Sequence, residues 1–269
     1  MIGMMPVNLR KNTKLPFSKS KKLIVSGCSY SDNWWTKKHG FLVWPELLAK
    51  KLDTECVNLA KCGKGNEYIY SSILDYLFLE NIGLVVVMWS EFGRLDFYRN
   101  YFYNNKEIYK WDALHFPVKD GTVNRHDDVD NVWKNKIMKE LYEMGFGEDI
   151  GTTRRSIRMF YMFQQTMKSL NIPFLMIMGT FPITRKLHLI NPKIQKDIID
   201  SHYLTSIDKN SFIGWPIFPE LGGWNIDTLL DKYEDVRISL DDCHPNEKGH
   251  KIISQEIYKH YELEYGTIF

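Results

Sequence analysis

The first apolar run of the chain ends in Val25-Ser26-Gly27-Cys28-Ser29-Tyr30-Ser31-Asp32. A short apolar run that stops at a glycine is typical of a buried strand leading into a turn. Ser29 would then stand just beyond the carboxyl end of a strand, where a hydroxyl can meet a ligand. We expect the sheet of the protein to form around this strand and the functional site to begin at this turn.

A second polar segment follows more than two hundred residues later and reads Asp241-Asp242-Cys243-His244-Pro245-Asn246. A serine and a distant Asp-x-x-His together supply the three groups that acyl transfer needs. In this hypothesis Ser29 attacks, His244 takes its proton, and Asp241 orients the imidazole and stabilises its charged form. The structural alternative is that Ser29 caps a turn and His244 caps the C-terminal helix.

Apolar runs and helical periods alternate between these two segments. Strands are expected at 23–26, 55–59, 83–89 and 174–179, and helices at 44–52, 66–79, 154–170 and 247–261. The run 83–89 is apolar on both faces, as in the centre of a parallel sheet covered by helices on each side. The alternation predicts an α/β fold, a doubly wound three-layer sandwich around a central parallel sheet.

Two aromatic-rich stretches, residues 92–152 and 181–237, interrupt this alternation. We interpret both as insertions at the carboxyl edge of the sheet, where such folds bind their ligands. The tryptophans of the chain either build small cores in these regions or present surfaces that stack on sugar rings. The candidates are Trp34, Trp35, Trp111, Trp215 and Trp224.

With these pieces in order, the chain resembles the SGNH (GDSL-type) hydrolase superfamily. Gly27-Cys28-Ser29 stands where the family has Gly-Asp-Ser, so Cys28 replaces the usual aspartate. Residues 58–66, Asn-Leu-Ala-Lys-Cys-Gly-Lys-Gly-Asn, resemble the second motif block, and Asp241-x-x-His244 resembles the last. The resemblance implies a flavodoxin-like α/β/α sandwich with Ser29 as nucleophile and His244 and Asp241 as its partners. It leaves the two insertions unmatched.

The second block implies an oxyanion hole, in which a glycine amide stabilises the negative charge of the tetrahedral intermediate. Gly63 is the first choice for that glycine and Gly65 the second, and the amide of Ser29 would be the other backbone donor. The family also has an asparagine in its third block, Gly-x-Asn-Asp, after the central strand. This chain has Trp89-Ser90-Glu91-Phe92-Gly93-Arg94 there, so Asn66 or Ser90 would have to replace the missing donor.

The residues after the central strand are also candidate contacts for a polar substrate. They are Trp89, Ser90, Glu91 and Arg94. The simpler interpretation of Glu91 and Arg94 is an ion pair at the start of a loop.

The four cysteines, Cys28, Cys56, Cys62 and Cys243, form no CxxC pair. Three of them adjoin a motif block. They are either small side chains that fill strand ends or, in the sharper alternative, ligands of a Cys-Cys-Cys-His metal site. We expect free thiols, no metal and no cofactor.

Composition limits the partners. The net charge is only +2, which indicates no general attraction to nucleic acid.

Residues 1–22 form a basic extension with six basic and no acidic residues, either a solvated lead-in or a docking arm for a polyanion or a partner protein. Residues 23–269 are expected to form a single SGNH-like domain. The sequence shows no signal peptide and no membrane-spanning run, so we expect a cytoplasmic or virion-associated protein.

The sequence therefore predicts a serine esterase that removes an acyl group, such as O-acetyl, from a carbohydrate or related polar ester. The expected partner is a small-molecule or glycan ester, with no specific nucleic acid and no membrane, and the oligomeric state stays open. Two alternatives remain: a non-catalytic binding or structural module with the same fold, and an acyltransferase with the same triad.

Overall fold

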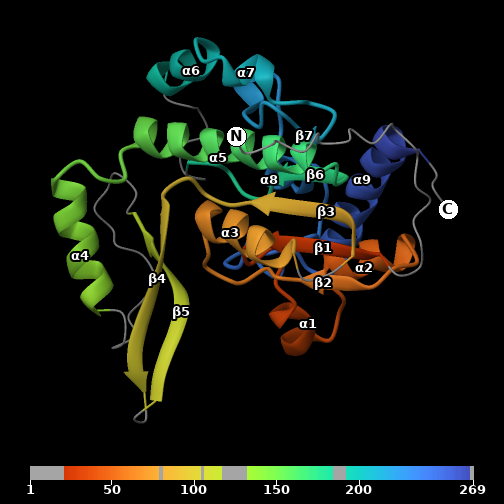
Figure 1. Cartoon of the computed structure of the whole chain (residues 1–269), viewed down its shortest axis with the longest axis horizontal. Helices are drawn as coiled ribbons and strands as arrows, with labels where there is room; N and C mark the ends of the chain where they lie inside the picture. Colours follow the sequence, from red (N-terminus) through yellow and green to blue (C-terminus); the bar gives the residue numbers. More distant parts are fainter. Residues whose placement is uncertain (1–20, 79–80, 104–105, 117–131, 184–191, 267–269) are drawn as a thin grey trace, which may run out of the picture.

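A parallel five-stranded sheet forms the centre of the computed structural model (Figure 1). The structure describes residues 21–78, 81–103, 106–116, 132–183 and 192–266, so most of the predicted extension at 1–22 lies outside it. The strand order is β2-β1-β3-β6-β7, and every neighbouring pair is parallel. The strands are β1 (Lys22–Gly27), β2 (Cys56–Asn58), β3 (Ile82–Trp89), β6 (Phe174–Met178) and β7 (Phe212–Ile213).

Helices cover both faces of the sheet because its central strands are apolar on both faces. Along β3, Val85 and Val87 point to one face, and Val86 and Met88 to the other. The first face packs against α3 (Asn66–Tyr76) and α5 (Asp149–Ser169), and α6 (Pro192–Ile199) packs on α5 from outside. The second face packs against α2 (Trp44–Lys51), α8 (Ile226–Leu230) and α9 (Glu247–Tyr265). This arrangement confirms the predicted three-layer α/β/α sandwich with a flavodoxin-like strand order.

The chain leaves the sheet for a long antiparallel hairpin after β3. Its strands are β4 (Arg94–Tyr103) and β5 (Lys106–His115), and α4 (Val132–Glu143) follows. Figure 1 shows this hairpin reaching away from the sheet, with α4 nearby. Both elements fall inside the stretch 92–152, which was predicted to be an insertion.

The second predicted insertion, 181–237, lies only partly outside the sheet. It contains α6, α7 (Tyr203–Ser206), a 3-10 turn (Pro219–Leu221) and α8, but also β7, which pairs with β6 through Met176 and Phe212. A strand of two residues is too short to give a recognisable apolar run, and the sequence prediction missed it for this reason.

The turn that carries Ser29 lies where the strand order reverses. Within the sheet, β2 is the neighbour of β1 on one edge and β3 is its neighbour on the other edge, so the chain changes direction across the sheet after β2. Open α/β sheets bind ligands at the carboxyl ends of strands at such a switch point. No helix in the described part of the chain combines the length and the apolar character needed to cross a bilayer.

Candidate active site

Ser29 occupies a tight turn directly after β1. The turn closes through a hydrogen bond from the Ser31 amide to the Cys28 carbonyl at 3.0 Å. Gly27 permits it, because a Cβ atom at this position would lie 2.5 Å from Ser31 Oγ and 3.2 Å from the Met88 carbonyl oxygen. The indole Nε1 of Trp35, in α1 (Trp34–His39), donates to the Ser29 carbonyl at 2.7 Å. Ser29 is therefore held in a fixed, almost fully buried position.

His244 and Asp242 complete a hydrogen-bonded chain with Ser29. His244 Nε2 lies 2.8 Å from Ser29 Oγ, and His244 Nδ1 lies 2.6 Å from Asp242 Oδ1. An ionised carboxylate only accepts hydrogen bonds, so Nδ1 carries a proton. In the neutral imidazole Nε2 is then unprotonated and can accept the Ser29 proton. A hydroxyl, an imidazole and a carboxylate linked in this order can pass a proton from the hydroxyl to the imidazole.

The carboxylate that contacts His244 is that of Asp242, whereas the sequence prediction named Asp241. The local backbone explains the difference. Residues 242 and 243 form no helical turn, and in extended chain alternate side chains share a side, which puts Asp242 beside His244. Asp242 Oδ1 also accepts from the His244 amide at 3.1 Å. Asp241 is exposed.

The electrostatics of Asp242 favour its ionised form. Burial raises the pKa of this carboxyl, but hydrogen bonds from the His244 ring and backbone, together with the charges of His244 and Lys38, lower it more. The net pKa lies below the ordinary value of 3.8, so the group beside the imidazole is an anion at neutral pH.

A buried polar network joins the turn of Ser29 to the turn of His244. Tyr30 donates its hydroxyl proton to Asp227 Oδ1 at 2.8 Å. Arg237 Nη1 donates to the same carboxylate oxygen at 2.7 Å and to the carbonyl of Cys243 at 2.8 Å. Because Tyr30 and Cys243 adjoin Ser29 and His244 in sequence, this network fixes the two halves of the site relative to each other.

Aromatic rings enclose the imidazole. The ring centroids of Trp35 and His244 are 4.6 Å apart, and Tyr30 meets the same imidazole edge-on at 5.4 Å.

The other tryptophans named from the sequence differ in exposure. Trp34 is 44% exposed, whereas Trp111, Trp215 and Trp224 pack partly buried against the two cores.

The second motif block lies beside the Ser29 turn. The amide of Lys61 donates to the Gly27 carbonyl at 3.1 Å, and the amide of Cys62 donates to Asp32 Oδ2 at 2.7 Å. Gly63 follows with a φ of 75°, a conformation that favours glycine. Within the described part of the chain, the amides of Ser29 and Gly63 have no hydrogen-bond acceptor. Gly65 differs, because its amide donates to Asp96 Oδ1 at 2.7 Å.

Asn66 is not placed to stabilise an oxyanion, although the sequence prediction included it. Its amide nitrogen donates to the Ser90 carbonyl at 3.1 Å and to Ser156 Oγ at 3.2 Å, and its oxygen accepts from the Ser90 amide at 2.8 Å. Both hydrogens of the amide are therefore used, and Asn66 ties the start of α3 to the end of β3. Ser90 Oγ is buried and has no partner among the described residues, and no hydrogen bond links it to the Ser29 turn.

Two of the predicted substrate contacts, at the end of β3 and just after it, are engaged with other residues of the protein. Trp89 is fully buried and packs against Phe160, with ring centroids 4.7 Å apart, so its side chain faces the core and no ligand. Arg94 Nε lies 3.2 Å from Glu91 Oε2. This is the ion pair of the simpler interpretation.

The cysteines near the motif blocks differ in exposure. Cys28 is buried, Cys243 is half-buried and Cys62 is exposed. The described residues contain no group of three or more His, Cys, Asp or Glu side chains arranged to hold a metal ion. The structure thus offers no arrangement that supports the Cys-Cys-Cys-His alternative.

His250, next to the last motif block, belongs to the core. Its Nδ1 accepts from the Trp44 amide at 3.3 Å. Burial, together with the neighbouring His244, lowers the pKa of His250 to about 3, so its ring is neutral at ordinary pH. His250 therefore serves packing between α9 and α2 and takes no part in proton transfer to Ser29.

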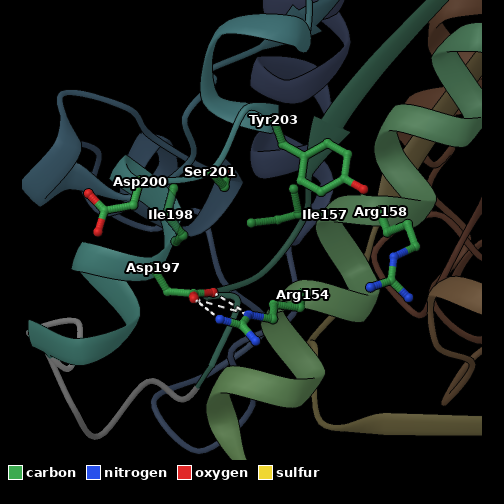
Figure 2. Close-up of a pocket in the computed structure, with 8 residues that line it drawn as sticks. All are labelled: Arg154, Ile157, Arg158, Asp197, Ile198, Asp200, Ser201 and Tyr203. Carbon is green, nitrogen blue, oxygen red and sulfur yellow. Dashed lines mark hydrogen bonds and ion pairs between the residues drawn. The ribbon is translucent and has the colours of Figure 1, made fainter.

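A separate cavity of about 390 Å³ lies between α5 and the α6–α7 region, and Figure 2 shows its lining. Arg154 of α5 pairs with Asp197 of α6 across it through both Nε and Nη2. None of its lining residues belongs to the hydrogen-bonded chain around Ser29. They are Arg154, Ile157, Arg158, Asp197, Ile198, Asp200, Ser201 and Tyr203.

Sequence reasoning did not give their observed roles to several residues that shape the site. Tyr30 lies inside the first motif but received no role, and Trp35 was named only as a candidate for a small core or a sugar-stacking surface. The residues that hold the site from a distance gave no signal, because their partners are far away in sequence. These are Asp96, His115, Asp227 and Arg237.

No protein-family model and no curated protein sequence matches the chain. Among solved structures, it is similar to an esterase from Pseudoalteromonas sp., with 12% identity, 90% of this chain and 97% of that chain covered, and a TM-score of 0.47. It is also similar to an acetylxylan esterase from Geobacillus stearothermophilus, with 11% identity, 93% and 98% coverage and a TM-score of 0.44. A third similar structure is that of a lipolytic protein of the G-D-S-L family from Desulfitobacterium hafniense, with 13% identity, 89% of this chain and 99% of that chain covered, and a TM-score of 0.43. Sequence identities and TM-scores as low as these decide nothing about the chemistry of this chain.

Proposed function

We propose that this protein is a serine esterase of SGNH type, with Ser29 as nucleophile, His244 as general base and acid, and Asp242 as the orienting carboxylate. One observation carries the proposal. His244 lies between Ser29 Oγ and Asp242 Oδ1, at 2.8 Å and 2.6 Å, although the serine and the histidine are 215 residues apart. Residues this far apart in sequence come into contact only through the tertiary fold, so the Ser29–His244 contact is not a consequence of local chain geometry.

In the first half of the reaction, Ser29 Oγ forms a bond to the ester carbonyl carbon while its proton moves to His244 Nε2. Asp242 stabilises the resulting imidazolium. The tetrahedral intermediate then loses its alcohol, which takes the proton from Nε2 as the carbon–oxygen bond breaks. An acyl-serine remains.

In the second half, water adds to the acyl carbon and gives its proton to His244 Nε2. The bond to Ser29 Oγ then breaks, and the oxygen takes the proton back from Nε2. The carboxylic acid leaves and the starting enzyme is restored. The same three side chains therefore serve both halves of the reaction.

The backbone amides of Ser29 and Gly63 are the proposed donors of the oxyanion hole. Both lack an acceptor within the described residues, and the contacts of Lys61 and Cys62 hold the Gly63 turn beside the nucleophile. Gly65 and Asn66 are excluded because their donors are used elsewhere. Two fixed amides supply stabilisation without reorganising during the reaction.

For the substrate we propose an acyl group, such as O-acetyl, on a carbohydrate or related polar ester. The β4–β5 hairpin supports this class. Tyr98 and Tyr109 are 58% and 55% exposed, with rings nearly parallel at 16° and centroids 6.3 Å apart. Trp111 stands edge-on to Tyr98 at 5.7 Å. Exposed rings of this kind can pack against the apolar C–H faces of a sugar.

The experiment is hydrolysis of a short-chain aryl ester by the wild-type protein and by Ser29→Ala, with circular dichroism to compare their folds. We expect hydrolysis by the wild type and loss of nearly all of it in a folded Ser29→Ala. Equal activity in the two proteins would remove Ser29 from the mechanism. A folded wild type without activity would favour the non-catalytic alternative, and acyl transfer to an added glycan in place of water would favour the transferase.

A further inference from the structure

The base of the β4–β5 hairpin contacts the second motif block through three side chains. Arg94 and His115 stand opposite each other in the hairpin, and Asp96 follows two residues after Arg94. His115 Nε2 donates to the Gly63 carbonyl at 2.8 Å, and Arg94 Nη1 donates to the Lys64 carbonyl at 2.9 Å. Asp96 accepts from the Gly65 amide at 2.7 Å.

These contacts hold consecutive residues of a turn that has little support of its own. Within the turn, the amide of Lys64 reaches the Lys61 carbonyl at 3.3 Å, a long hydrogen bond. Gly63 at φ 75° can adopt many other conformations, because glycine is the least restricted residue. The Ser29 turn holds Lys61 and Cys62, at the start of this turn, and the hairpin holds the three residues that follow.

The hairpin and the turn fit closely. A Cβ atom on Gly65 would lie 2.7 Å from Arg94 Cβ and 2.8 Å from Asp96 Oδ2, so only glycine allows the approach. Asp96 Oδ2 also accepts from the Tyr68 amide at 3.0 Å and so caps the start of α3. Arg155 of α5 braces the hairpin base by donating to the Arg94 carbonyl. The base is thus fixed both to α3 and to α5.

We propose that the base of the hairpin is part of the catalytic apparatus, with His115 as a positioning residue that fixes the Gly63 turn for the oxyanion. This inference rests on the proposed function. His115 would act through the turn, because its ring holds the carbonyl of Gly63. This contact restrains the residue whose amide is the proposed oxyanion donor. The hairpin thereby takes over support of the oxyanion hole in a chain that lacks the asparagine of the third block.

The contact defines a matched set of variants. A carbonyl only accepts, so His115 Nε2 must carry a proton, and a charge is not required. The side-chain amide of His115→Gln places a donor near the position of Nε2, whereas that of His115→Asn is shorter and does not reach it. His202→Ala, an exposed histidine on the distant α7 side, is the control for loss of an imidazole.

The test measures kcat and KM for a short-chain aryl ester in wild type, His115→Asn, His115→Gln and His202→Ala. A misplaced donor costs on the order of 10- to 100-fold in rate, so we expect kcat of His115→Asn to fall by about that factor with KM nearly unchanged. His115→Gln should recover most of it, and His202→Ala should match the wild type. A kcat of His115→Asn equal to wild type, or equal losses in the Asn and Gln variants, would overturn the inference.

Amide hydrogen exchange of residues 61–66 separates this inference from the proposed function. Faster exchange there in His115→Asn than in wild type and His115→Gln is expected whether or not the protein hydrolyses esters. Unchanged exchange would overturn the hairpin's role. A wild type without esterase activity would reject the proposed function, and the positioning role in catalysis with it, while exchange alone still decides whether the hairpin holds the turn.

Discussion

Two turns meet beside Ser29, and they are held in different ways. The turn that ends at His244 is closed mainly by its own residues: the Ile238 amide donates to the His244 carbonyl at 2.8 Å, and Ser239 and Asp242 bond each other. The turn of Gly63 is held from outside, by side chains of a hairpin 30 to 52 residues further along the chain. The turn that carries His244 and Asp242 is therefore locally encoded, whereas the Gly63 turn depends on tertiary packing.

The largest expected effect concerns the locally encoded turn. In Asp242→Asn, the side-chain amide can donate to Nδ1 and so favour the wrong tautomer of His244, and kcat should fall by about 10⁴-fold. Asp241→Asn should stay within about 3-fold of wild type, because Asp241 is exposed and the carboxylate at Nδ1 is that of Asp242. Steady-state kinetics of the two variants decides between them. A large loss in Asp241→Asn with little loss in Asp242→Asn would restore the original assignment.

A smaller effect is expected at the turn held from outside. Gly63→Ala introduces a Cβ with room to spare, since the nearest atoms are those of the His115 ring at 3.9 Å. The cost comes from φ, because an L-residue in the left-handed region loses about 1–2 kcal/mol. If the turn shifts to relieve this strain, kcat falls by about 10-fold.

Gly63→Asn is the matched variant, because asparagine tolerates the left-handed region better than alanine. It should keep more of the wild-type kcat than Gly63→Ala does. Equal kcat in wild type, Gly63→Ala and Gly63→Asn would show that the conformation of this turn does not matter for the reaction.

The remaining prediction concerns the stability of the folded protein and not the rate of the reaction. The pKa of His250 is about 3 in the folded protein, below its ordinary 6.5. Between these values the unfolded chain binds a proton that the folded protein does not, so stability falls as pH falls from about 6.5 toward 3. From pH 7 to pH 5 this should amount to about 2 kcal/mol.

His250→Asn keeps an acceptor for the Trp44 amide and removes the titration. Chemical denaturation at pH 7 and pH 5 should therefore show a smaller loss of the free energy of unfolding in His250→Asn than in wild type. Equal losses would mean that His250 is not kept neutral by its surroundings.

Sequence patterns predicted what depends on local chemistry. The two-sided apolar run of β3 predicted the centre of the sheet, and the glycine at the end of β1 predicted the turn of Ser29. Strand β7 was missed because two residues form no pattern. Asp241 was preferred to Asp242 because spacing alone does not reveal which side of a turn a side chain faces.

The oxyanion side could not be predicted in the same way. Asn66 has the right residue type and position, but its amide is used on Ser90 and Ser156, the latter 90 residues away. His115 lies 52 residues from Gly63 in a stretch without motif. Such contacts follow from how the hairpin packs on α3. Hydrophobic periodicity predicts helices and strands but does not predict how two elements pack against each other.

The central claim is that Ser29 is an activated nucleophile. Its most direct test is reaction of the folded wild-type protein with a fluorophosphonate, followed by intact-mass measurement and peptide mapping. We predict one equivalent of label on Ser29, with labelling lost in Ser29→Ala and strongly slowed in His244→Ala. A folded wild type that takes up no label, or takes it up at another residue, would contradict the account.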